Sequence, residues 1–153
     1  MKKILIIIIL MIVALPFATN AQFAKFETEC LGIEQDGSQT VRAWGTGRNR
    51  SDAVEQAKKN AVFDVLFKGV RGGSSECNLK PLVPEVNARE RYEEYFDRFF
   101  ADGGEYTKFV SAADEKLFSK GKQKNKIGSH FGVTVRVLRS ELKAQLKSDG
   151  VIK

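Results

Sequence analysis

The sequence predicts an α+β fold: a four-stranded, largely antiparallel sheet with helices packed on one face, in the order ββααββα. Segments with alternating apolar and polar residues, typical of strands, stand beside segments in which apolar residues recur every three or four positions, typical of helices. Strands and helices come in runs rather than in strict alternation, which favours α+β over a doubly wound fold.

Residues 1–21 have the three parts of a secretory signal peptide. Two lysines follow the initial methionine, an apolar run covers Ile4–Leu15, and Ala21 is a small residue at the expected cleavage position. The run is shorter than the roughly 20 residues of a spanning helix, although an uncleaved membrane anchor is the alternative. We expect cleavage after Ala21, a single domain over residues 22–153, and a periplasmic or secreted protein without a stable membrane anchor.

Two strands joined by a tight turn are expected at the start of this domain. They cover Phe26–Ile33 and Gln39–Thr46, where apolar and polar residues alternate. The Asp36-Gly37 pair between them is a strong hairpin signal, because both residue types tolerate the backbone angles of a two-residue turn. The two strands should therefore be antiparallel neighbours.

The clearest helix is expected directly after the second strand. Ser51 or Asp52 is the expected N-cap, and Asp52 with Glu55 forms a capping-box pattern. Apolar residues then follow at helical spacing until Gly69, where the helix should end. Two alanines on its apolar side would let it lie close to a sheet.

Residues 71–84 form a linker rich in Gly, Ser and Pro. The linker contains Cys77, and the other of the two cysteines, Cys30, lies in the first expected strand. An even pair of cysteines in an exported protein favours a disulfide, which would tether the linker to that strand. Two buried free thiols, or a reactive thiol, are the alternatives.

A second helix is expected after the linker. Asn87 and Glu90 form another capping-box pattern at its start, and Gly103 is a natural C-cap. Acidic residues and arginines alternate along one side of this helix, as on a solvated face with ion pairs.

Two strands and a short helix should complete the fold. A strand of uncertain length is expected over Tyr106–Phe118, and Phe131–Val137 alternates most regularly of all segments. Ser140 should cap the last helix, which would end at Gly150.

Motifs for catalysis are missing from the sequence. The chain has one histidine, His130, and no H-E-x-x-H, Walker A or G-x-S-x-G pattern. Gly45-Thr46-Gly47 precedes a helix, but it has too few glycines for a phosphate-binding loop. We therefore expect a protein that is not an enzyme, with no catalytic residues, no metal site and no cofactor.

One face of the expected sheet carries candidates for partner binding. Arg42 and Trp44 lie on one side of the second strand, and Thr134 and Arg136 lie opposite the valines of the strand near the C-terminus. If the helices cover one face only, these four residues share the other, where an aromatic ring with two guanidinium groups could bind a partner. The alternative is that the N-terminal segment or the last helix covers Trp44.

A basic turn is the second candidate site. Lys122, Lys124 and Lys126 alternate with small polar residues between two expected strands. Such a turn could bind an anionic envelope polymer, although a solvated hairpin tip is the simpler interpretation. Because no aromatic residues lie among the lysines, nucleic acid is not an expected partner.

The segment Gln39–Gly69 also carries a resemblance to known families. Its VRAWGTG strand followed by SDAVEQAKKNAVFDVL resembles small exported envelope proteins related to the amino-terminal domain of flagellar assembly protein T, and a class of small bacterial lipoproteins. The chain departs from the lipoproteins because it lacks a cysteine at the end of its apolar run, so membrane anchoring does not carry over. The resemblance implies a non-enzymatic envelope or assembly role and supplies no catalytic residues.

Together these observations predict an adaptor or assembly factor that acts through contacts with an envelope protein. The alternative prediction is a binding module for anionic envelope glycans or lipid headgroups.

Overall fold

The computed structural model describes residues 27–73, 77, 80–118 and 129–153. Within them the strands form one five-stranded sheet in the order β3-β1-β2-β5-β4. The strands are β1 (Glu29–Ile33), β2 (Gln39–Gly47), β3 (Gly72–Gly73), β4 (Val110–Phe118) and β5 (Ser129–Val137). All neighbours are antiparallel except β1 and β3, which are parallel. The predicted α+β class with a largely antiparallel sheet is therefore confirmed.

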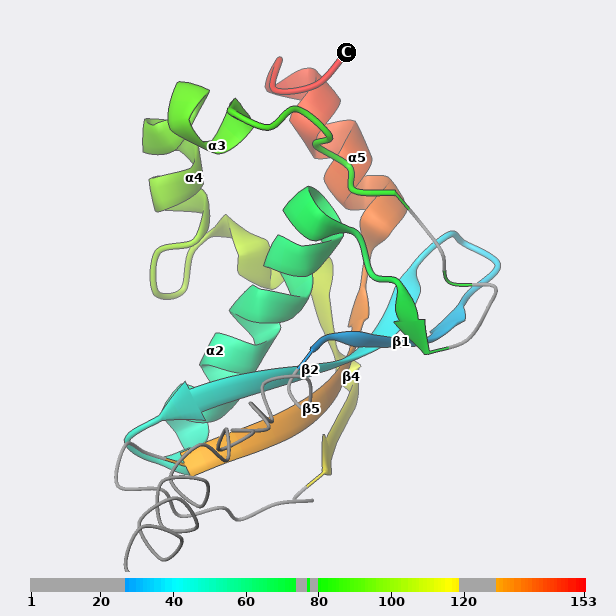
Figure 1. Cartoon of the computed structure of the whole chain (residues 1–153), viewed down its shortest axis with the longest axis vertical. Coiled ribbons are helices and arrows are strands. Elements are labelled where there is room, and N and C mark those ends of the chain that lie inside the picture. The colour runs from blue at the N-terminus through cyan, green and yellow to red at the C-terminus, as the bar shows by residue number, and fades with distance from the viewer. Residues whose placement is uncertain (1–26, 74–76, 78–79, 119–128) are drawn as a thin grey trace, which may run out of the picture.

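The helices lie on one face of this sheet (Figure 1). They are α2 (Arg50–Phe63), which continues into the π-helix η2 (Asp64–Lys68), then α3 (Ala88–Arg91), α4 (Glu93–Phe99), the 3-10 helix η4 (Glu105–Phe109) and α5 (Arg139–Ser148). One apolar cluster joins the helices to the covered face of the sheet, so the described residues have a single core.

Very close backbone packing holds α2 on the sheet. Val41 and Ala43 face the helix and are fully buried, as are Ala53 and Ala57 on the helix. Between them lies Gly45, where a Cβ atom would overlap the carbonyl oxygen of Ala53 and the amide nitrogen of Ala57. The small residues that the sequence places at these positions thus let two backbones touch.

The start of α2 differs from the prediction. Asn49, not Ser51 or Asp52, is the N-cap, because its backbone is extended and its side-chain oxygen accepts a hydrogen bond from the Asp52 amide at 2.9 Å. Asp52 therefore supplies the amide that is capped. The Glu55 carboxylate instead accepts a hydrogen bond from the Tyr106 hydroxyl at 3.1 Å, which ties α2 to η4.

The predicted linker is more ordered than its composition suggests. Gly72 and Gly73 form β3 beside β1, so the sheet has a fifth strand that was not predicted. Cys77 is disulfide-bonded to Cys30, with 5.8 Å between their Cα atoms, which confirms the predicted pairing. Farther along, the amides of Leu82 and Val83 donate to the carbonyls of Val65 and Leu66, whose π-helical turn leaves them available.

The predicted second helix is broken at Tyr92 into α3 and α4. The side chain of Asn87 makes no cap hydrogen bond, so the predicted capping box with Glu90 is wrong. The helix η4 occupies the start of the segment predicted as a strand, and β4 begins only at Val110.

The last helix also lacks its predicted cap. Leu138 is the N-cap residue of α5, and no side chain caps the helix. The Ser140 hydroxyl instead donates a hydrogen bond to the Asp36 carbonyl at 3.1 Å. It thereby connects α5 to the turn of the β1–β2 hairpin.

Candidate functional site

The structure brings the four predicted partner-binding residues to one face of the sheet, opposite the helices. The antiparallel register of β2 and β5 pairs Arg42 with Thr134, and Arg136 lies two positions along β5, opposite Thr40. Trp44 is paired with Gly132. We call Arg42, Trp44, Thr134 and Arg136 the tryptophan face.

Two glutamates that were not predicted from the sequence complete this face. Arg42 Nη1 lies 3.3 Å from Glu29 Oε2, and Arg136 Nη2 lies 3.5 Å from Glu34 Oε1. The Thr40 hydroxyl also donates to Glu34 at 3.2 Å. Each guanidinium on the face therefore has a carboxylate partner, so the face is close to neutral and has little attraction for a polyanion.

A β-bulge explains why the place of Glu29 could not be predicted from the sequence. Ile33 pairs with Gln39, but Cys30 pairs with Val41, so Leu31 is an extra residue in β1. An unbroken hairpin would pair Cys30, not Glu29, with Arg42. The bulge moves Cys30 to the helix side of the sheet, where Cys77 lies, and moves Glu29 to the tryptophan face.

The Trp44 ring lies directly over the backbone of β5. A Cβ atom on Gly132 would be only 3.1 to 3.3 Å from three ring atoms, so a larger residue at this position would require the ring to shift. From the other side of the sheet, the Asn60 side chain of α2 donates to the Trp44 carbonyl at 2.7 Å. The ring is half-buried, and Thr134 beside it is only 5% exposed.

Exposure separates the four predicted residues. Arg42 and Arg136 are about one-third exposed, at 33% and 32% of their side chains, and can touch a partner. Thr134 is too buried to do so. The helix α5 lies on the opposite side of the sheet (Figure 1) and does not cover Trp44, whereas the N-terminal segment up to residue 26 lies outside the described residues.

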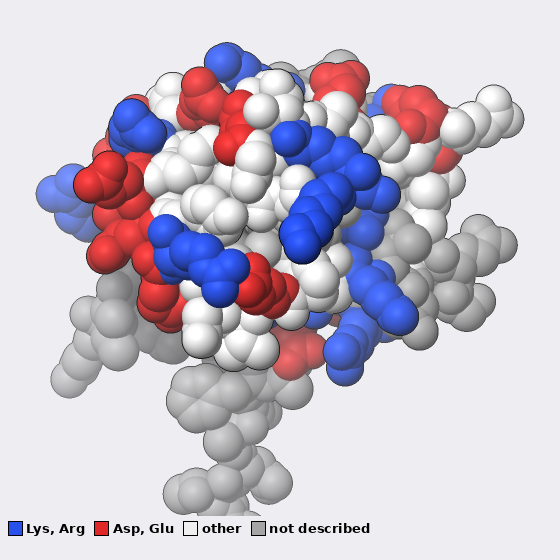
Figure 2. Space-filling view, turned by 90° about the horizontal axis from the view of Figure 1, so that it is seen from above, with Lys and Arg blue, Asp and Glu red and all other residues white. Residues whose placement is uncertain are grey.

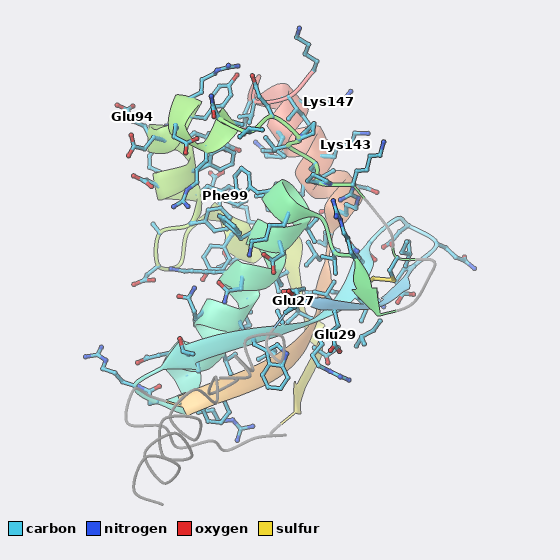
Figure 3. The ribbon with its side chains drawn as sticks, viewed as in Figure 1. Glu27, Glu29, Glu94, Phe99, Lys143 and Lys147 are labelled. Atoms are coloured by element: carbon cyan, nitrogen blue, oxygen red, sulfur yellow. A yellow bond between two sulfur atoms is a disulfide. The ribbon has the colours of Figure 1, made fainter. Side chains whose placement is uncertain are left out.

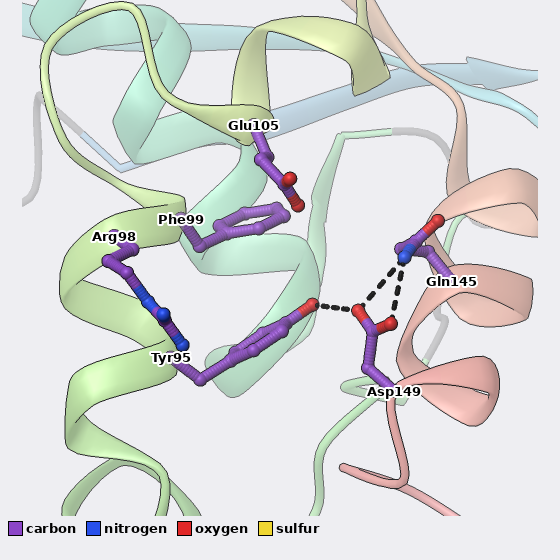
Figure 4. A pocket seen from close by; sticks show the side chains of 6 residues that line it. All are labelled: Tyr95, Arg98, Phe99, Glu105, Gln145 and Asp149. Atoms are coloured by element: carbon purple, nitrogen blue, oxygen red, sulfur yellow. Dashed lines mark hydrogen bonds between the residues drawn. The ribbon is translucent and has the colours of Figure 1, made fainter.

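A hollow of about 480 Å³ lies between α4, η4 and α5 (Figure 4), lined by Tyr95, Arg98, Phe99, Glu105, Gln145 and Asp149. The Tyr95 hydroxyl donates to Asp149 at 2.7 Å, and the Gln145 amide donates to both oxygens of that carboxylate at 2.9 Å. Burial, followed by the hydrogen bond to Asp149, raises the pKa of Tyr95 above its usual value. The Tyr95 hydroxyl and the Gln145 amide both bond to Asp149, so this arrangement joins α4 to α5.

The basic turn, metal sites and membrane-spanning helices are considered last. Lys122, Lys124 and Lys126 lie among residues 119–128, outside the described residues. Over the described ranges, no three His, Cys, Asp or Glu side chains are grouped so that they could hold a metal ion. No helix in the same ranges has the length and apolar character needed to cross a membrane.

Comparison with protein-family models, with curated proteins and with solved structures finds no match to this chain. The resemblance of Gln39–Gly69 to exported envelope proteins therefore stays a prediction. The two glycines in the VRAWGTG segment have a structural role. At Gly45 and Gly47, β2 and the start of α2 come into backbone contact.

Proposed function

We propose that this protein is an exported, non-catalytic adaptor or assembly factor that contacts an envelope protein through the tryptophan face. One observation carries the proposal: an aromatic ring packs against Gly132 on a sheet face that bears no described helix, flanked by two guanidinium groups that are already paired with carboxylates. Such a near-neutral aromatic surface suits a protein contact, because aromatic and arginine side chains dominate the energetics of protein interfaces.

Electrostatics supports a protein partner over a polymer at this surface. A polyanion site needs cations that release counterions on binding, whereas Arg42 and Arg136 face Glu29 and Glu34 at 3.3 and 3.5 Å. The alternative function, binding of anionic envelope glycans or lipid headgroups, rests on Lys122, Lys124 and Lys126 and draws no support from the tryptophan face.

The test is capture of envelope proteins by residues 22–153 with four baits: wild type, Trp44→Ala, Trp44→Phe and Arg48→Ala. Arg48 is an exposed cation directly after β2 that pairs with Asp52 of α2, and its variant is the control. We expect one protein to be captured by wild type and by the control, weakly by Trp44→Phe and not by Trp44→Ala, with all four baits folded by circular dichroism.

Two outcomes would overturn the proposal. Equal capture by Trp44→Ala and wild type would remove the tryptophan face from the function. Retention of wall or lipid material that is lost in 0.5 M salt (about a 4 Å screening length) and in the triple variant Lys122→Ala, Lys124→Ala, Lys126→Ala would establish the alternative.

A further inference from the structure

The end of the molecule formed by α3, α4 and α5 has a mainly acidic side and a mainly basic side. Figure 2 looks down on this end and shows a continuous basic stripe on one side, an opposite side where acidic groups lie together with some basic ones, and uncharged surface between the two. In Figure 3, Glu94 projects from α4 on one side, and Lys143 and Lys147 project from α5 on the other. We call this surface the charged end.

On the acidic side, two of the three arginines contact other groups of the same molecule. Residues 84–99 carry five acidic and three basic side chains. Two of the arginines are engaged within the molecule: Arg91 pairs with Glu85 at 2.7 Å, and the Arg89 guanidinium lies over the Phe63 ring at 5.5 Å. Glu90, Glu93 and Glu94 are exposed.

The basic side balances it. Residues 139–153 carry four basic and two acidic side chains, and one of the acids, Asp149, is held by Tyr95 and Gln145. Lys143 and Lys147 are four residues apart on α5, both exposed, and thus lie on the same side of the helix. Counted over side chains alone, the two segments therefore have opposite net charges of −2 and +2.

An exposed apolar residue leads into the acidic helices. Val86 is 92% exposed, far more than any other large apolar residue in the described chain, and it lies in the segment that enters α3. A single exposed valine is unremarkable by itself, but here it belongs to the end at which the two charged sides meet.

We propose that the charged end is a contact between two copies of this chain. A two-fold rotation places the acidic side of each copy against the basic side of the other, so the same attraction forms twice, and uncharged surface meets uncharged surface. A polyanion would be repelled by Glu90 and Glu94, and a polycation by Lys143 and Lys147. A surface with both signs in balance best fits its own copy.

The test is sedimentation velocity of residues 22–153 with two charge-reversal variants. The first is Lys143→Glu with Lys147→Glu, which makes both sides acidic. The second is Glu90→Lys with Glu94→Lys, which makes both sides basic. All four positions are exposed, so circular dichroism should show both variants folded.

We expect wild type to dimerise at low salt and to dissociate at about 0.5 M salt, where the screening length falls to about 4 Å. Each variant alone should be monomeric, and an equimolar mixture of the two should restore the dimer. A protein concentration of about 0.1 mM is high enough to detect a weak dimer. Wild type that stays monomeric at this concentration would overturn the proposal. So would dimers that persist in both variants, or a mixture that does not associate.

Discussion

The two faces of the sheet are built on opposite principles. On the helix side, Val41, Ala43 and Val133 are fully buried, and Gly45 lets the α2 backbone touch β2. On the tryptophan face, the contacts are made by side chains: two partly exposed ion pairs, and a ring that lies over Gly132. We infer that stability is concentrated where backbones meet, and that substitutions of side chains on the other face cost little.

Gly45→Ala should break this arrangement most severely. The added methyl group overlaps backbone atoms of Ala53 and Ala57 rather than a movable side chain, so the helix must shift off the sheet. We expect a loss of about 4 kcal/mol in the free energy of unfolding, the upper range for overpacking, measured by urea denaturation. A loss below about 1 kcal/mol would show that α2 can slide, and the proposed rigidity of this face would be wrong.

Replacing Cys30 and Cys77 together by alanine tests the edge of the helix side. The bond closes a loop across a sequence separation of 47, and its removal should cost about 2 to 4 kcal/mol because the unfolded chain gains freedom. Wild type in reductant should show the same loss, and the double variant should not respond to reductant. A variant as stable as oxidised wild type would contradict this expectation.

Gly132→Ala is the counterpart of Gly45→Ala on the tryptophan face. Its methyl group meets the edge of a ring that can tilt away, so the expected loss is only about 1 kcal/mol. The displaced ring should change the fluorescence of the chain's one tryptophan and weaken partner capture. Unchanged fluorescence would mean that Trp44 does not lie on β5.

The ion pairs should give the smallest effect. A double-mutant cycle with Arg136→Ala and Glu34→Ala should show a coupling energy of about 0.5 kcal/mol or less, because both side chains remain exposed to solvent. Partner capture should respond more strongly than stability does. A coupling energy above about 2 kcal/mol is typical of buried pairs. It would show that this face is buried, and the proposed difference between the two faces would be wrong.

The sequence was most informative where periodicity is strong. The alternation in Phe131–Val137 and the helical spacing between Ser51 and Gly69 predicted β5 and α2, and the cysteine count with the predicted signal peptide favoured the disulfide. The alternation and the helical spacing reflect burial on one side of an element, and this can be predicted from the order of apolar and polar residues alone.

Features that depend on distant contacts could not be predicted in this way. Gly72 and Gly73 have no strand propensity, and they form β3 only where β1 lies alongside, close to the disulfide. The bulge at Leu31 has no sequence signal, yet it decides which of Cys30 and Glu29 faces Arg42. The capping residues failed similarly, since Asn49 and Ser51 are both good caps and only the backbone conformation selects one.

The disulfide has a mechanical consequence. Cys30–Cys77 closes a covalent ring that contains β2, α2 and β3, whereas β4, β5 and α5 lie outside it. A force that pulls on the two ends of the chain would pass through the bond and could peel β5 from β2, but could not extend the ring. The ring holds a length of chain that would measure on the order of 160 Å if extended, and the force would not stretch it. This length includes the whole segment that links the tryptophan face to α2.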